Sequence, residues 1–82
     1  MKIVWDEPKR ATNIAKHGLD FADLSFEFFL SAKVVPSTDG RHIAIGEFND
    51  MIIIAVVFKP LGSEALSVIS MRPASTKERK LL

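Results

Sequence analysis

The sequence predicts one small α+β domain, a mainly antiparallel sheet of four to five strands with two N-terminal helices packed on it and a short C-terminal helix. The 82 residues give room for one hydrophobic core and not for two, so the expected domain spans residues 1–82. The chain is 48% hydrophobic and 26% charged, an ordinary globular balance. Helical spacing up to Ala32 gives way to strand-like runs, which predicts the order β-α-α-β-β-β-β-α.

The N-terminal third begins with a strand and a helix. Residues 2–5 form a short β-type run that ends at Asp6, a good helix N-cap, and Pro8 suits the first turn that follows. The helix of roughly three turns ends at Gly18, a natural C′ residue. Within it an apolar stripe recurs at helical spacing, formed by Ala11, Ile14 and Ala15.

A second helix is predicted from residue 21 to about residue 30, with Asp20 as its cap. Its apolar side chains wrap most of the circumference, as in a helix that is either central to the core or pressed against another chain. Four phenylalanines in nine positions exceed what one face of a small sheet needs. We therefore expect part of this helix to form an interface.

Strands are predicted for the second half, over residues 34–35, 41–48, 51–58 and 64–71, with turn signals such as Asp39-Gly40 between them. The 51–58 run is apolar, rich in β-branched residues and unbroken, which indicates a central strand covered on both sides. Ser75 and Glu78 have capping-box spacing and predict a short terminal helix.

Composition excludes several classes of function. The net charge of +1 neither favours nor opposes nucleic acid, and the absence of cysteine removes disulfides, thiolate metal sites and a thiol nucleophile. His17 and His42 lack metal-site spacing, and no nucleotide-binding, zinc-hydrolase or serine-hydrolase motif occurs. No apolar run approaches the ~20 residues of a membrane span. We expect a cytoplasmic protein that needs no cofactor or metal and contacts no membrane.

Positive charge gathers near the C-terminus, where residues 70–82 hold four cations against one acid. They form either a phosphate-binding surface or ordinary solvated cations. Arg72, at a predicted strand end, either points toward a ligand or pairs with an acid on a neighbouring element. His17 suits proton transfer near neutral pH or acts as a cation at a helix C-terminus. Glu78 is more simply a helix cap than a catalytic acid or base, and His42 is more simply a packed or surface histidine of a strand.

These groups permit metal-free RNA cleavage. The 2′-hydroxyl of RNA attacks its own phosphate, so the protein needs no external nucleophile. Arginines would stabilise the extra phosphorane charge, and one titrating group would move protons. The composition allows this mechanism without selecting it.

The chain resembles the BrnT toxin family along essentially its whole length. The motifs that carry the resemblance are WDExK at residues 5–9, Asn13, KHG at 16–18, IAIG at 43–46, I-S-x-R-x-A at 69–74 and the pair Glu78-Arg79. Each motif alone is weak, but the combination is specific.

The resemblance implies a RelE-like fold and a translation-inhibiting ribonuclease toxin of a type II toxin–antitoxin system. A BrnA-like ribbon-helix-helix antitoxin would neutralise it, and their complex, such as a heterotetramer, would contact operator DNA only through the antitoxin; a toxin homodimer stays an alternative. The implied catalytic residues are His17, Arg72, Glu78 and Arg79. We expect Lys16, Arg41, Lys77 and Lys80 to bind RNA.

Some positions depart from the family pattern. Ser67 stands where an arginine is usual, Met71 replaces an alanine, Pro73 replaces a basic residue, and Leu82 replaces an aromatic residue, commonly tyrosine. These departures leave open a catalytically weak or inactive homologue that acts as an antitoxin-binding co-repressor. A plain RNA-binding module is a third alternative, although the predicted strands lack the aromatic pattern on which single-stranded RNA stacks.

Overall fold

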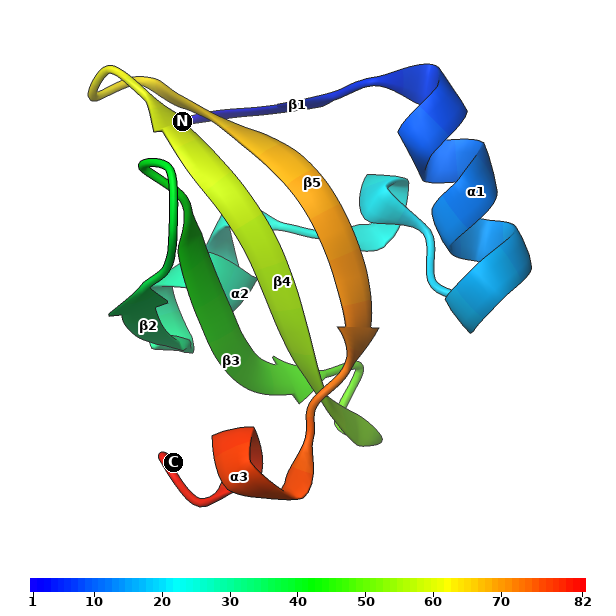
Figure 1. Ribbon diagram of the computed structural model, residues 1–82, viewed down its shortest axis with the longest axis vertical. Helices are drawn as coiled ribbons and strands as arrows, with labels where there is room; N and C mark the ends of the chain where they lie inside the picture. Colours follow the sequence, from blue (N-terminus) through cyan, green and yellow to red (C-terminus); the bar gives the residue numbers. More distant parts are fainter.

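The computed structural model describes all of residues 1–82 and shows an α+β fold with a five-stranded mixed sheet (Figure 1). The strands lie in the order β1-β5-β4-β3-β2; β1 runs parallel to β5, and the other neighbours are antiparallel. The elements along the chain are β1 (Lys2–Trp5), α1 (Glu7–His17), the 3₁₀ turn η1 (Phe21–Asp23), α2 (Phe26–Ser31), β2 (Lys33–Pro36), β3 (His42–Phe48), β4 (Ile52–Leu61), β5 (Ala65–Pro73) and α3 (Thr76–Arg79). The predicted α+β class with four to five strands is therefore confirmed. None of the helices is long and apolar enough to cross a membrane.

The strand β4 occupies the centre of the sheet, as its unbroken apolar run predicts. Three consecutive residues at its middle, Ile54, Ala55 and Val56, are fully buried, so both faces are covered there. The strand runs on past its predicted end at residue 58 to Leu61, which pairs with Ala65. Lys59 and Pro60 interrupt the apolar pattern, but strand pairing depends on the backbone and continues through them.

The prediction of one continuous second helix is wrong. Leu24 has extended backbone between η1 and α2, and the Ser25 side chain accepts a hydrogen bond from the backbone N–H of Phe28. A serine in this position begins a new helix, so the segment is a 3₁₀ turn followed by a short α-helix. The predicted Asp20 cap is confirmed, since its carboxylate accepts from the Ala22 N–H.

This break distributes the phenylalanines differently from the prediction. Phe21 and Phe28 are buried in the core, and Phe29 packs edge-on against Phe58 of β4. Only Phe26, 42% exposed, and Leu30, 69% exposed, remain as large apolar side chains on the surface of this segment. The core itself lies between the sheet and η1–α2 and contains Phe21, Leu24, Phe28, Ala44, Phe48, Ile54, Val56, Phe58, Leu66, Val68 and Met71.

The first helix packs through a different face from its apolar stripe. It follows Asp6, contains a proline in its first turn and ends at Gly18 in the left-handed conformation, as the sequence predicts. Ala11, Ile14 and Ala15 are nevertheless exposed, whereas Asn13 is buried against β5. In Figure 1, α1 stands beside β5, away from α2. Polar contacts must therefore hold it in place.

Candidate functional site

A groove of about 480 Å³ lies between α1 and β5. Most of its lining residues are polar, and they include four basic side chains and no acidic one. The lining residues are Pro8, Lys9, Thr12, Asn13, Lys16, His17, Ile69, Ser70 and Arg72. The fold thus brings together three predicted site residues, Lys16, His17 and Arg72, from segments more than 50 residues apart.

One face of α1 supplies most of the positive charge. Lys9 lies four residues before Asn13, and Lys16 and His17 lie three and four residues after it, so all of them share one side of the helix. Lys16 and His17 also occupy the last turn, where the helix dipole favours positive charge. Neither side chain forms a salt bridge, so both stay available to an anion in the groove.

A bulge in β5 supplies the opposite wall. Ser70 pairs with Val57 and Val68 pairs with Phe58, so Ile69 is the extra residue in β5. Bulges re-aim the side chains that follow them. Met71 is fully buried in the core, and its neighbours Ser70 and Arg72 line the groove.

The Arg72 guanidinium is held by Glu78 of α3. Nη1 donates to Glu78 Oε1 at 2.7 Å and Nη2 donates to Oε2 at 2.9 Å. Glu78 Oε1 also accepts from the backbone N–H of Ser75 at 2.9 Å and so completes the capping box. The two readings of Arg72 left open by the sequence therefore coexist, because Arg72 pairs with an acid on another element and also lines the groove.

This pairing changes the acid–base properties of Glu78. The hydrogen bonds from Arg72, the largest cause, lower the pKa of Glu78 to about 2. With both oxygens bound and so low a pKa, the carboxylate is a weak proton acceptor near neutral pH. The geometry therefore favours a role for Glu78 in orienting Arg72 and does not favour a role as a general base.

Other predicted site residues lie outside the groove. Arg79 lines a second hollow of about 460 Å³ with Glu47 and residues around Ile53 and Pro73. Arg41 immediately precedes His42, which pairs with Phe58 toward the β4–β5 turn, whereas Arg72 pairs with Ala55 nearer the other end of β4. Lys77 in α3 and Lys80 after it are exposed.

His42 is packed in the sheet, one of the two structural roles, packed or surface, that the sequence favours for it. Its ring stacks on Phe58 with centroids 5.8 Å apart, and its Nδ1 is buried without a hydrogen-bond partner. No group of three or more His, Cys, Asp or Glu side chains is placed to hold a metal ion.

Sequence reasoning did not name as site residues four polar residues of the groove, namely Lys9, Thr12, Asn13 and Ser70. Lys9, Asn13 and Ser70 belong to the motifs that carry the family resemblance, and Lys9 shares the helix face of Lys16 and His17. This helical spacing would have placed Lys9 beside the predicted cations.

Comparisons with known proteins agree with this fold. The family model described as the ribonuclease toxin BrnT of type II toxin–antitoxin systems matches residues 5–78. The 1.1 Å crystal structure of the Brucella abortus ribonuclease toxin BrnT is 79% identical in sequence and superposes with a TM-score of 0.87, covering 93% of this chain and 99% of that one. No curated relative matches the chain. The fold and sequence thus define a toxin of the type II toxin–antitoxin class. The chain belongs to the BrnT family of ribonuclease toxins.

Proposed function

We propose that this chain inhibits translation by cleaving RNA in the groove between α1 and β5, without a metal ion. The observation that carries the proposal is the meeting of Lys16, His17 and Arg72 in one groove that holds no acidic side chain. Such a groove attracts the phosphate backbone of RNA and offers an imidazole as an acid–base group. Family membership supports ribonuclease activity, and the groove supplies a chemistry for it.

The reaction needs no nucleophile from the protein. The 2′-oxygen of RNA attacks the adjacent phosphorus, the bond from phosphorus to the 5′-oxygen breaks, and the products are a 2′,3′-cyclic phosphate and a 5′-hydroxyl. One proton leaves the 2′-hydroxyl and one reaches the departing 5′-oxygen. His17 is the proposed proton-transfer group because it is the one imidazole that lines the groove, and histidine is the side chain most often used as a general acid or base.

The cations have separate proposed roles. Arg72 neutralises the charge that accumulates on the phosphorane, and Glu78 holds its guanidinium in one orientation. Lys16 adds positive charge to the groove, and Lys9 does the same from one turn earlier. Arg79, Arg41, Lys77 and Lys80 lie outside the groove and are proposed to contact RNA that extends beyond the scissile phosphate.

The proposed partner is a BrnA-like ribbon-helix-helix antitoxin, which would also carry the contact with operator DNA. The exposed Phe26 and Leu30 of α2 give such a partner apolar surface to cover. A heterotetramer with the antitoxin and a toxin homodimer are the two proposed assemblies. The RelE-like classification of the fold stays a prediction.

The test is induction of the chain alone in a bacterial host, followed by growth and RNA integrity. Arg72→Ala and Arg72→Lys are compared with Lys33→Ala, which removes a cation from β2 at the far edge of the sheet. We expect growth arrest and RNA cleavage from the wild type and from Lys33→Ala. Arg72→Ala should reduce cleavage by purified protein by about 10²- to 10³-fold. A folded Arg72→Ala variant that still cleaves RNA and arrests growth would contradict the assignment.

The same experiment tests the co-repressor alternative. Ser67 lacks the usual cation, and Arg72 already has Glu78 as a partner in the free chain. Against this, Ser67 is paired with Lys59 of β4, so a cation still lies beside that position. A folded wild type that leaves RNA intact and yet retains operator DNA together with its antitoxin would favour the co-repressor.

A further inference from the structure

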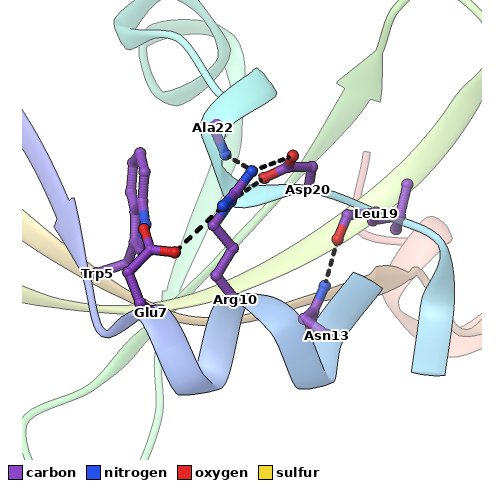
Figure 2. Close-up of polar contacts among 7 residues, drawn as sticks. All are labelled: Trp5, Glu7, Arg10, Asn13, Leu19, Asp20 and Ala22. Atoms are coloured by element: carbon purple, nitrogen blue, oxygen red, sulfur yellow. Dashed lines mark hydrogen bonds and ion pairs between the residues drawn. The ribbon is translucent and has the colours of Figure 1, made fainter. Parts of the chain in front are cut away.

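Asn13 is the only polar side chain buried in the fold, with 6% of its surface exposed. Its amide makes three hydrogen bonds to backbone groups outside its own helix. Nδ2 donates to the carbonyl of Met71 at 2.8 Å and to the carbonyl of Leu19 at 2.9 Å, and Oδ1 accepts from the N–H of Met71 at 3.1 Å. Figure 2 shows the contact with Leu19. Asn13 thus fastens α1 directly to the backbone of β5.

The path of the chain explains why β5 needs this contact. β1 pairs with β5 only as far as Trp5 and Val68, and the chain then leaves the sheet to form α1. Beyond Val68 this edge of β5 has no neighbouring strand. The Asn13 amide offers one donor and one acceptor to Met71, as a paired strand would, and so satisfies backbone groups that burial would otherwise leave unpaired.

We propose that Asn13 is the positioning residue of the groove and sets the spacing between the cations of α1 and Arg72. On the helix it stands between Lys9 on one side and Lys16 and His17 on the other. On the strand it holds the one residue that separates Ser70 from Arg72. The proposal rests on the proposed function, because it assigns Asn13 a role in the same RNA-cleaving groove.

Asn13 acts through its neighbours and does not bind substrate by its amide N–H groups. Both hydrogens of Nδ2 already point to carbonyls of the protein, so neither is left for a phosphate oxygen. The catalytic groups on the two walls must be held within a small tolerance, because a misplacement of about 1 Å can cost a reaction about 100-fold. A three-point contact at the centre of the cationic face provides that restraint.

A second anchor keeps α1 attached when Asn13 is changed. Arg10 donates from Nε and Nη2 to the Asp20 carboxylate at 2.7 and 2.9 Å, and from Nη1 to Glu7 at 3.1 Å (Figure 2). This anchor joins α1 to the segment before η1 and makes no contact with β5. An Asn13 variant therefore retains a docked helix whose distance from Arg72 is no longer fixed.

The test compares Asn13→Ala and Asn13→Asp with Val68→Ala, which removes buried volume from β5 at a core residue that does not line the groove. Asn13→Asp keeps an acceptor for the Met71 N–H and loses both donors, so it serves if Asn13→Ala does not fold. All variants are assayed at a temperature where circular dichroism shows them folded. At saturating RNA we expect the cleavage rate of either Asn13 variant to fall by about 10- to 100-fold. Val68→Ala should keep a rate near that of the wild type.

Binding of a 2′-O-methyl RNA oligonucleotide, which cannot be cleaved by this chemistry, separates the two proposals. We expect the Asn13 variants to bind it several-fold more weakly than Val68→Ala does. If the wild type binds the oligonucleotide but cleaves no RNA, the proposed function fails while the binding comparison still tests the role of Asn13. If the folded Asn13 variants bind and cleave as Val68→Ala does, Asn13 is only a structural residue and the proposal is overturned.

Discussion

The two N-terminal helical segments are attached to the same sheet by opposite means. The η1–α2 segment inserts Phe21, Leu24 and Phe28 into the core, and these side chains touch the sheet without a specific polar contact. The helix α1 exposes its apolar stripe and is held by Asn13 and Arg10. One segment is docked by apolar burial and the other by hydrogen bonds and ion pairs.

The difference corresponds to what each segment does. Apolar burial is non-directional and contributes most of the stability of a small domain. Hydrogen bonds are directional and fix distances to a few tenths of an ångström, although each adds only modest net stability. The groove lies beside α1, the helix docked by hydrogen bonds. Polar docking also leaves the lysines and His17 free of protein partners, as a phosphate-binding surface requires.

The largest effect that tests this comparison is expected from Phe21→Ala. Phe21 is fully buried and meets the Trp5 ring edge-on, with centroids 6.5 Å apart. Truncating a buried phenylalanine costs about 3–5 kcal/mol of unfolding free energy, a large share of what a domain of this size has. Urea denaturation followed by circular dichroism should show this loss. A loss below about 1 kcal/mol would mean that apolar burial is not what holds the η1–α2 segment.

A smaller effect is expected from Arg10→Gln, which removes an anchor of α1. The hydrogen bonds from Arg10 lower the pKa of Asp20. The pKa of Glu7 is lowered mainly by its hydrogen bond from Trp5 and, to a smaller extent, by the one from Arg10. Carboxylates with a lowered pKa stabilise the fold above their unfolded pKa, about 4, and this stability is lost as the pH falls through the folded value. At pH 7 the Tm difference between wild type and Arg10→Gln should be smaller than the Tm difference between wild type and Phe21→Ala. The Arg10→Gln difference should also shrink as the pH falls below 4.

The Arg72–Glu78 pair provides a matched control for that titration. Glu78→Gln keeps an acceptor for the Ser75 N–H but loses the charge that pairs with Arg72. Because the pKa of Glu78 is lowered to about 2, the stability from this pair is present above pH 4.5 and is lost only as the pH approaches 2. A Tm difference between wild type and Glu78→Gln that stays constant from pH 7 to pH 2 would show that the Arg72–Glu78 ion pair does not stabilise the fold.

The sequence predicts the sheet and α1 well, because both depend on local signals. Alternation, turn residues and helix caps act within a few positions, so the strands of the second half, the end of α1 at Gly18 and the capping box at Ser75 are confirmed. The second helix is predicted wrongly because a count of apolar residues weighs phenylalanines and overlooks Ser25, whose side chain begins a new helix.

The sequence predicts charged residues that line the candidate groove but does not predict that Asn13 anchors α1 to β5. Lys16, His17 and Arg72 are candidates by residue type and position, and the fold brings them together. The role of Asn13 depends on Met71, 58 residues away, and on the departure of β1 from the sheet after Trp5. Neither fact has a local signature, since asparagine on the polar side of a helix ordinarily indicates solvent exposure.

The smallest effect on the free energy of unfolding is expected from Ile14→Ala, a change that would be costly if α1 packed through its apolar stripe. Ile14 belongs to the apolar stripe of α1 but is 39% exposed, whereas Leu24, beside η1, is 8% exposed. Ile14→Ala should change the unfolding free energy by no more than about 0.5 kcal/mol, partly because alanine favours the helix, while Leu24→Ala should cost about 2–5 kcal/mol. Urea denaturation of the two variants measures both values under the same conditions. If Ile14→Ala costs as much as Leu24→Ala, then α1 packs through its apolar stripe in solution. Asn13 could not then lie against Met71, and the contrast between the two segments would fail together with the positioning role of Asn13.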